Sequence, residues 1–191
     1  MTTLADSTDF SKAHKRQRTY KACPPELIAK YRGRLPDVLV NTWEASGFQE
    51  FSDGFLWTVN PDELREVAAD FPNNFQTEFI DVIFRTAFGD LIVSHKGKLY
   101  HLSAVTMRSD SLPDRLEHVL ALHFGQKRFL DAIFFLNMFK KGLKRLGAPA
   151  EDEVYALVPA PAMGGDITAD NLEKAKLRVY LNFLAQLQSK D

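Results

Sequence analysis

The spacing of hydrophobic residues changes twice along the chain. In the first part, apolar residues recur three and four positions apart, as at Leu64, Val67 and Phe71, which places them on one face of a helix. Residues 79–105 instead hold three runs of β-branched and aromatic residues separated by glycine turns, a pattern typical of an antiparallel meander. The second half returns to helical spacing, except for one more strand predicted over residues 154–158. The pattern predicts an α+β fold, a mainly antiparallel sheet packed with helices.

The boundaries of the predicted elements follow from capping residues, prolines and glycines. Helices are predicted over residues 24–33, 36–46, 61–71, 111–124, 126–146 and 168–187. Strands are predicted over residues 48–51, 55–59, 79–88, 91–95, 99–105 and 154–158. Pro36 suits the first turn of a helix, because its missing N–H would have no partner there, and Gly47 suits a left-handed helix cap. Asp53-Gly54 between two aromatic runs predicts a β-hairpin.

Residues 1–20 show neither helical nor strand spacing, and most of them are polar. Such a segment cannot bury enough apolar surface to offset the entropy lost on ordering, so we expect a short, disordered N-terminal arm. Its basic run, residues 12–18, is a candidate contact for nucleic acid or an anionic surface. Because this run lacks interleaved aromatic residues, we interpret it as a solvated arm.

The bulk composition is that of an ordinary globular protein, with 191 residues, 45% of them hydrophobic, and a net charge of −1. No apolar run approaches the roughly 20 residues needed to cross a bilayer, and the N-terminus lacks the apolar core of a secretory signal. Cys23 is the single cysteine, which excludes an internal disulfide and fits a reducing compartment. We therefore expect a cytoplasmic protein without a membrane-spanning segment.

Charge is distributed unevenly along the chain. Residues 12–34 contain eight lysines and arginines and one acid, whereas residues 35–90 contain eleven acids and two arginines, a local balance of −9. An acidic block of this kind repels nucleic acid and attracts a basic partner. The alternative interpretation is a solvated acidic face that keeps the protein soluble.

The sequence predicts no catalytic residue, no metal ligand set and no cofactor. His118 and His123 are five residues apart, which places them far apart around a helix and not on one metal-binding face. Cys23 has no histidine near it in the sequence, so it is a nucleophile only if the fold brings a base to it. Phosphate-loop, dinucleotide and serine-hydrolase motifs are absent from the sequence.

Two parts of the chain resemble known families. The pattern LP…W…G…F.DG..W.VNP in residues 35–61 resembles the GAD-like domain. The C-terminal half resembles the domain that commonly follows it, which is associated with type VI secretion immunity proteins. The matching pieces are FRTAFGDL, Leu146-Gly147, DEVYALVPAPAMGGD and NLEKAKLRVYLNFLAQL. This resemblance divides the chain into a flexible basic arm, a GAD-like domain and an immunity C-terminal domain, or into the arm and one continuous compact unit. The divisions are residues 1–20, 21–78 and 79–191.

The resemblance implies a cytoplasmic immunity protein that is not an enzyme. Such a protein binds the basic nuclease domain of a type VI secretion DNase toxin and blocks it by stoichiometric, non-covalent occlusion. It implies neither nucleic-acid binding nor membrane attachment, and it leaves the oligomeric state open. The acids expected to contact the toxin are Asp37, Glu44, Glu50, Asp53, Asp62, Glu63, Asp152, Glu153 and Asp166. The alternatives are a general protein- or peptide-binding module without a toxin partner, and nucleic-acid binding through the basic segment.

Overall fold

The computed structural model describes residues 1–188, with Gln188 described by its backbone. The strands are β1 (Gln17–Lys21), β2 (Phe48–Phe51), β3 (Leu56–Thr58), β4 (Ile80–Thr86), β5 (Leu91–His95), β6 (Lys98–Ser103), β7 (Arg108–Ser111), β8 (Glu153–Leu157) and β9 (Leu172–Lys176). The helices are α1 (Thr8–Ala13), α2 (Pro25–Tyr31), α3 (Asp37–Ser46), α4 (Arg65–Ala69), α5 (Leu116–His118), α6 (Lys127–Ala132), α7 (Leu136–Leu146) and α8 (Leu177–Gln188). Residues 189–191, the end of the predicted C-terminal unit, lie outside the described residues.

The predicted α+β fold is confirmed. Seven strands form one sheet in the order β1 to β7, each antiparallel to the next, and β8 and β9 form a separate antiparallel pair. The sheet runs without a break across residue 78, because β3 pairs directly with β4. The added edge strand β7 was not predicted, since its sequence RSDS is polar and largely exposed.

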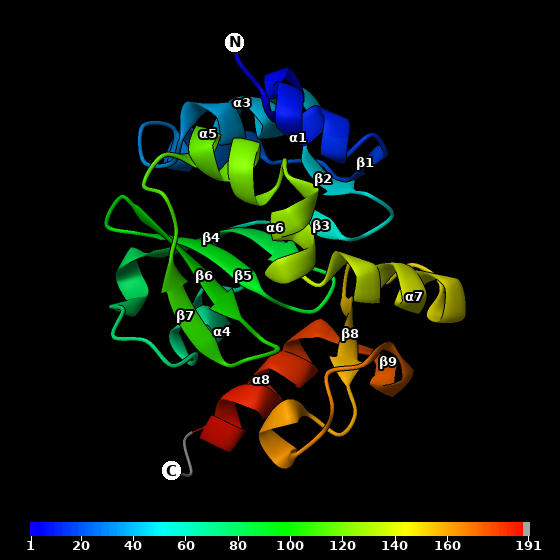
Figure 1. Ribbon diagram of the computed structural model, residues 1–191. Coiled ribbons are helices and arrows are strands. Elements are labelled where there is room, and N and C mark those ends of the chain that lie inside the picture. Colours follow the sequence, from blue (N-terminus) through cyan, green and yellow to red (C-terminus); the bar gives the residue numbers. More distant parts are fainter. Residues whose placement is uncertain (189–191) are drawn as a thin grey trace.

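Helices cover both faces of the sheet (Figure 1). One hydrophobic cluster joins one face to α1, α2, α3, α6, α7 and the segment containing α5. A second cluster joins the other face to α4 and α8 and contains Trp57. The two clusters meet at β4, where the pairing register with β5 shifts between Val82 and Phe84. The neighbours Ile83 and Phe84 therefore both belong to the first cluster, and the alternation of faces is broken before Arg85.

The predicted hairpin between β2 and β3 is confirmed. Ser52, Asp53 and Gly54 all have positive φ angles, of 55°, 59° and 87°, the left-handed backbone that a tight turn requires. Gly47 ends α3 as predicted, with a φ of 70°. A Cβ atom on Gly47 would lie 2.5 Å from the carbonyl oxygen of Lys21, so glycine also permits β1 to approach closely.

The prediction of a disordered N-terminal arm is wrong. Leu4 and Phe10 are buried in the first cluster. His14 is also buried, and its ring nitrogens lie 2.9 Å from Ser52 Oγ and 2.9 Å from the carbonyl oxygen of Phe124. These three buried residues are six and four positions apart, which gives no helical or strand period, and their partners lie far away in the sequence. The sequence pattern therefore did not show that the segment is ordered. The segment continues into β1, which pairs with β2 at the edge of the sheet.

Four predicted helices have different boundaries in the structure. The helix over 111–124 begins only at Leu116 and continues as a π-helix over residues 119–123, because Ser111 still belongs to β7. The helix over 126–146 is two helices, separated at Phe135 with a φ of 55°, and the break lets Phe134 pack 5.1 Å from Phe124. The helix over 168–187 begins only at residue 177, because residues 172–176 form β9 and satisfy the backbone of β8. The helix over 61–71 begins at residue 65, since Asn60 Oδ1 accepts a hydrogen bond from the Asp62 N–H in a local turn.

Candidate functional site

Seven of the nine acids expected to contact a toxin form ion pairs within the chain. These pairs are Asp53–Arg16 (2.9 Å), Glu50–Arg18 (2.9 Å), Glu63–Lys21 (2.8 Å), Asp62–Lys30 (2.7 Å), Glu44–Arg32 (2.6 Å), Asp152–Lys176 (2.6 Å) and Glu153–Lys174 (3.5 Å). Five of the cations belong to the basic segment 12–34. The fold thus sets the basic segment against the acidic block, and much of the local −9 balance is neutralised internally.

Asp37 and Asp166 form no ion pair with any residue that the structure describes, and both are exposed. Asp37 lies in a groove of about 550 Å³ whose lining also includes Asp6 and Glu117. We call this the Asp37 groove. No lysine or arginine lines it, although Glu117 Oε2 is 3.6 Å from Arg115 Nε. It is an acidic depression on the side of the molecule that carries α3.

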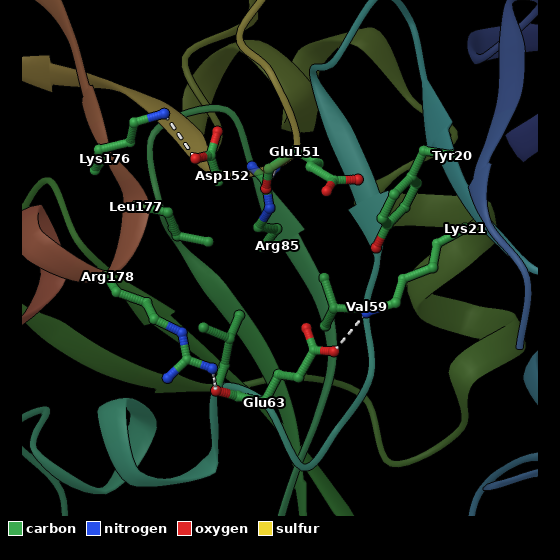
Figure 2. Close-up of a pocket in the computed structure, with 11 residues that line it drawn as sticks. Tyr20, Lys21, Val59, Glu63, Arg85, Glu151, Asp152, Lys176, Leu177 and Arg178 are labelled. Carbon is green, nitrogen blue, oxygen red and sulfur yellow. Dashed lines mark hydrogen bonds and ion pairs between the residues drawn. The ribbon is translucent and has the colours of Figure 1, made fainter. Parts of the chain in front are cut away.

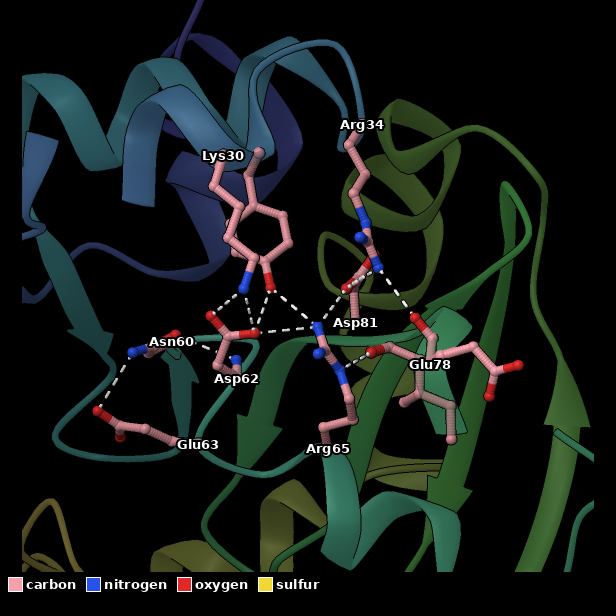
Figure 3. A network of polar contacts seen from close by, with 10 residues as sticks. Lys30, Arg34, Asn60, Asp62, Glu63, Arg65, Glu78 and Asp81 are labelled. Atoms are coloured by element: carbon pink, nitrogen blue, oxygen red, sulfur yellow. Dashed lines mark hydrogen bonds and ion pairs between the residues drawn. The ribbon is translucent and has the colours of Figure 1, made fainter. Parts of the chain in front are cut away.

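The most densely connected ion pairs surround Asp81 (Figure 3). Arg34 donates to both Asp81 oxygens, with distances of 2.7 and 2.8 Å. Arg65 donates to the same carboxylate at 3.0 Å, and also to Tyr31 Oη at 3.0 Å. The Asp81 side chain is 5% exposed, and two guanidinium groups compensate its charge. The network joins α2, the loop after it and α4 to the start of β4.

Asp62 belongs to the same network. Its Oδ1 accepts hydrogen bonds from Tyr31 Oη at 2.8 Å and from Lys30 Nζ at 2.7 Å. Burial alone would raise the pKa of Asp62, but the hydrogen bonds from Lys30 and Tyr31 outweigh it and the pKa is lowered. Burial, followed by the bond to Asp62, raises the pKa of Tyr31 above its ordinary value. The contacts made by Asp62 hold this part of the fold together.

A second groove, of about 280 Å³, lies between β1, β4, the segment before β8 and the start of α8 (Figure 2). We call it the Arg85 groove. Its lining consists of Tyr20, Lys21, Val59, Glu63, Leu64, Arg85, Glu151, Asp152, Lys176, Leu177 and Arg178. In Figure 2, residues 20–21 and residues 176–178 lie on opposite sides, with Arg85 between them. Segments distant in sequence therefore form this groove together.

Arg85 is 1% exposed, yet no carboxylate of the described residues lies within ion-pair distance of it. Its guanidinium carbon is 4.3 Å from the centre of the Trp57 ring, a cation–π contact. Arg85 Nη2 donates to the carbonyl oxygen of Glu151 at 2.8 Å, while three further carbonyl contacts are 3.4 to 3.5 Å long. Burial lowers the pKa of Arg85 to about 10, so the group is charged at neutral pH.

The rim of the Arg85 groove holds two internal ion pairs, Lys21–Glu63 and Lys176–Asp152. Arg178 donates to the backbone carbonyl of Glu63. Neither Arg178 nor Glu151 forms an ion pair with a described residue. With Arg85, the groove therefore has two cations without a carboxylate partner and one acid without a cation, a local balance of +1.

Sequence reasoning did not identify Arg85. The signal that could have found it is one arginine within FIDVIFRTAF, a run whose other residues suit a buried strand. All seven residues of β4 are indeed buried, and a charge in such a strand requires a polar partner or a functional reason.

The remaining candidates for chemistry are the single cysteine and the possible metal ligands. Burial, with a smaller contribution from Glu26, raises the pKa of the Cys23 thiol to about 11, so the thiol is protonated at neutral pH. Among the described residues, no group of three or more His, Cys, Asp and Glu side chains is placed to hold a metal ion. Within residues 1–188, no helix has the length and apolar character required to cross a membrane.

Comparison with known proteins gives matches to two family models and to solved structures. Residues 8–106 match the model of the GAD-like domain, and residues 117–188 match the model described as T6SS immunity protein Tdi1, C-terminal. The crystal structure of Atu4351 from Agrobacterium tumefaciens superposes with a TM-score of 0.77 over 94% of this chain and 88% of that one. The sequence identity is 17%, so the likeness shows a shared fold. The search of curated proteins gave no match.

Proposed function

The chain belongs to the GAD-like domain family and continues into the C-terminal domain of a type VI secretion immunity protein, and from this we propose that it binds a cognate DNase toxin and neutralises it. The observation that supports this most is the order and extent of the two matches, which cover residues 8–106 and 117–188. We propose that it acts in the bacterial cytoplasm, as a binding protein and not as an enzyme. Inhibition is stoichiometric and non-covalent, by occlusion of the nuclease domain.

The Asp37 groove is the surface of this chain best suited to a basic toxin. A DNase is cationic where it grips phosphates, so an inhibitor that covers that surface benefits from uncompensated acids. Asp6, Asp37 and Glu117 line one depression without a lysine or arginine among the lining residues. Asp166 remains a predicted contact on the same reasoning. The seven paired acids also remain predicted contacts, although each would share its charge with a cation of its own chain.

Charge complementarity would act mainly on the rate of association. Steering by opposite charges raises association rates and weakens with salt, because the Debye length falls to about 8 Å near physiological ionic strength. A close, desolvated charge pair contributes about 1.5 kcal/mol or more to a complex. The area of the interface does not by itself set the affinity.

The direct test looks for a nuclease-domain toxin gene beside the gene of this chain and co-expresses the two proteins. The proposal predicts that cellular DNA stays intact and that a complex survives size-exclusion chromatography. Continued DNA degradation without a complex would reject the proposal for that toxin.

The surface is tested by charge reversal at an exposed acid. We expect Asp37→Lys to slow association about fivefold or more at low salt and to differ little from the parent in 0.5 M salt. Glu66→Lys is the matched control, because Glu66 is exposed on α4 and forms no ion pair with a described residue. Equal association rates for Asp37→Lys and the parent at low salt would remove the Asp37 groove from the interface.

A further inference from the structure

We propose that the Arg85 groove is a binding site for a carboxylate group carried on a small apolar body. The groove combines residues of the GAD-like match, such as Arg85, with residues of the C-terminal match, such as Arg178. A ligand held there would contact both parts at once. This inference is independent of the toxin, because it concerns an anion that this groove can bind by itself.

The charge balance of the groove favours an anion with one negative charge. Lys21 and Lys176 already have carboxylate partners, at 2.8 and 2.6 Å. Arg85 and Arg178 have backbone carbonyl partners only among the described residues, while Glu151 leaves one negative charge at the rim. The net charge of these unpaired groups is +1. One carboxylate neutralises it, whereas a phosphate dianion would leave an excess negative charge.

The hydrogen bonds of Arg85 leave donor capacity for a ligand. A guanidinium has five N–H donors, arranged so that two of them match the two oxygens of a carboxylate. Only the contact with the Glu151 carbonyl, at 2.8 Å, is short, and the other three are 3.4 to 3.5 Å. Long contacts of this kind contribute little, so a carboxylate would improve on them. Trp57 stacks on the guanidinium and restricts its orientation.

The start of α8 adds to the positive field. This helix has 12 residues and begins at Leu177, whose N–H donates to the carbonyl oxygen of Asp152 at 2.8 Å. The N-terminus of a helix favours a nearby negative charge. In Figure 2, residues 177 and 178 line the same groove as Arg85.

The groove also has apolar walls and a limited size. Val59, Leu64 and Leu177 line it and are 4 to 7% exposed. A volume of about 280 Å³ is at the lower end of ligand pockets and fits a short acid or a single acidic side chain. Because each buried methylene strengthens binding about three- to fourfold, an acid with two more methylenes should bind about tenfold more tightly.

The competing interpretation is that Arg85 only ties β4 to the segment before β8 through its carbonyl contacts. Replacing Arg85 is not a clean test of binding, because it removes the proposed partner of the ligand and the carbonyl contacts together. Arg178 does separate them, because it is exposed at the start of α8 and its hydrogen bond goes to the Glu63 carbonyl, not to the carbonyls that Arg85 contacts. Arg178→Gln should therefore preserve the fold and weaken the binding of the anion.

The experiment is an NMR titration of the ¹⁵N-labelled full chain with sodium butyrate, sodium acetate and butylammonium chloride at constant ionic strength. We expect saturable shifts of the Arg85 Nε–Hε signal and of the Leu177 and Arg178 amides, with butyrate binding about tenfold more tightly than acetate. Arg178→Gln should weaken butyrate binding about threefold or more while its thermal unfolding stays that of the parent. Arg108→Gln, on the exposed edge strand β7, is the matched control and should bind butyrate as the parent does.

Three outcomes would overturn the proposal. The first is shifts that rise linearly without saturation, and the second is butylammonium binding as tightly as butyrate. The third is unchanged butyrate affinity in Arg178→Gln, because the charge balance would then be irrelevant. A separate titration with inorganic phosphate tests the charge of the anion, and tighter binding of phosphate than of butyrate would likewise overturn the proposal.

A final arm identifies the source of the carboxylate. If butyrate no longer binds in a complex with the toxin, the toxin covers the groove, and a toxin variant with its contacting acid changed to the amide tests whether that acid supplies the carboxylate. If butyrate still binds, the groove serves a free organic acid, and both results support the site. A chain that binds no toxin can still be titrated, so the two proposals fail independently.

Discussion

Asp81 and Arg85 are both buried in strand β4, but their charges are compensated differently. The Asp81 carboxylate accepts hydrogen bonds from Arg34 at both oxygens and from Arg65 at one, at distances of 2.7 to 3.0 Å. The Arg85 guanidinium has backbone carbonyls and an aromatic ring around it, and no carboxylate partner among the described residues. Asp81 is paired with two opposite charges and so belongs to the scaffold. Arg85 has none beside it, so its positive charge acts on the adjoining Arg85 groove.

The β-bulge in β4 creates this difference. Residues 81 and 85 would share a face in a regular strand, because side chains alternate with a period of two. The register shift between Val82 and Phe84 breaks the alternation. As a result Arg85 stacks on Trp57 in the second cluster, while Asp81 contacts Arg34, whose guanidinium lies over the Tyr31 ring of the first cluster. Bulges often re-aim a side chain in this way.

The largest loss of stability is expected on substitution of Asp81. Asp81→Ala should lower the free energy of unfolding by about 3–5 kcal/mol, because it leaves Arg34 and Arg65 without the carboxylate they share. Urea unfolding followed by tryptophan fluorescence measures the loss. Glu78→Gln is the control, since the Glu78 side chain is exposed and only its backbone carbonyl contacts Arg34. A loss below 1 kcal/mol for Asp81→Ala would show that the network is not needed for the fold.

His14 extends the comparison to a buried group that is neutral. Burial lowers the pKa of His14 to about 4, partly opposed by its hydrogen bond to the Phe124 carbonyl. Between pH 6.5 and about 4, His14 is protonated in the unfolded chain but stays neutral in the folded chain. Stability is therefore full above pH 6.5 and should fall by about 3 kcal/mol as the pH drops toward 4.

Urea unfolding at several pH values between 7 and 4 measures this effect, and His14→Gln removes it. Burial also lowers the pKa of His95 and His123, so the relevant quantity is the difference in pH dependence between the parent and the variant. Parallel curves for the two proteins would show that His14 takes up its proton in the folded state.

The smallest effect is expected at Arg85. Arg85→Met should lower the free energy of unfolding by about 1–2 kcal/mol, because it removes a costly buried charge and leaves carbonyls, not charges, without partners. The same urea measurement applies. A loss as large as that of Asp81→Ala would place Arg85 in the scaffold and remove the distinction between the two residues.

Much of the architecture could be predicted because its signals are local. The Asp53-Gly54 turn, the Gly47 helix end and the meander of β4 to β6 depend on residues close together in the sequence. Where local preference and tertiary contacts disagreed, the prediction failed. Residues 172–176 form a strand because β8 offers them backbone partners, although their sequence continues a helical pattern.

The acids of the candidate interface show the same limit. Their identity and their concentration in residues 35–90 are properties of the sequence, and so is the resemblance that pointed to an immunity protein. The sequence does not show that Arg16 meets Asp53, or that Arg34 meets Asp81 47 residues away. These pairs decided which acids keep an uncompensated charge. Asp37 keeps its charge, which makes it a better candidate contact for a basic partner than the seven paired acids.

The sequence alone determined the α+β class, the order of the hairpins and the family, because hydrophobic period, turn residues and short motifs are written along the chain. The tertiary structure decided the folding of residues 1–20, the burial of Arg85 and the charge that remains in each groove. These depend on contacts between segments far apart in the sequence, such as His14 with Phe124 and Arg85 with Glu151. A charge becomes structural or available for binding only when its neighbours in space are fixed.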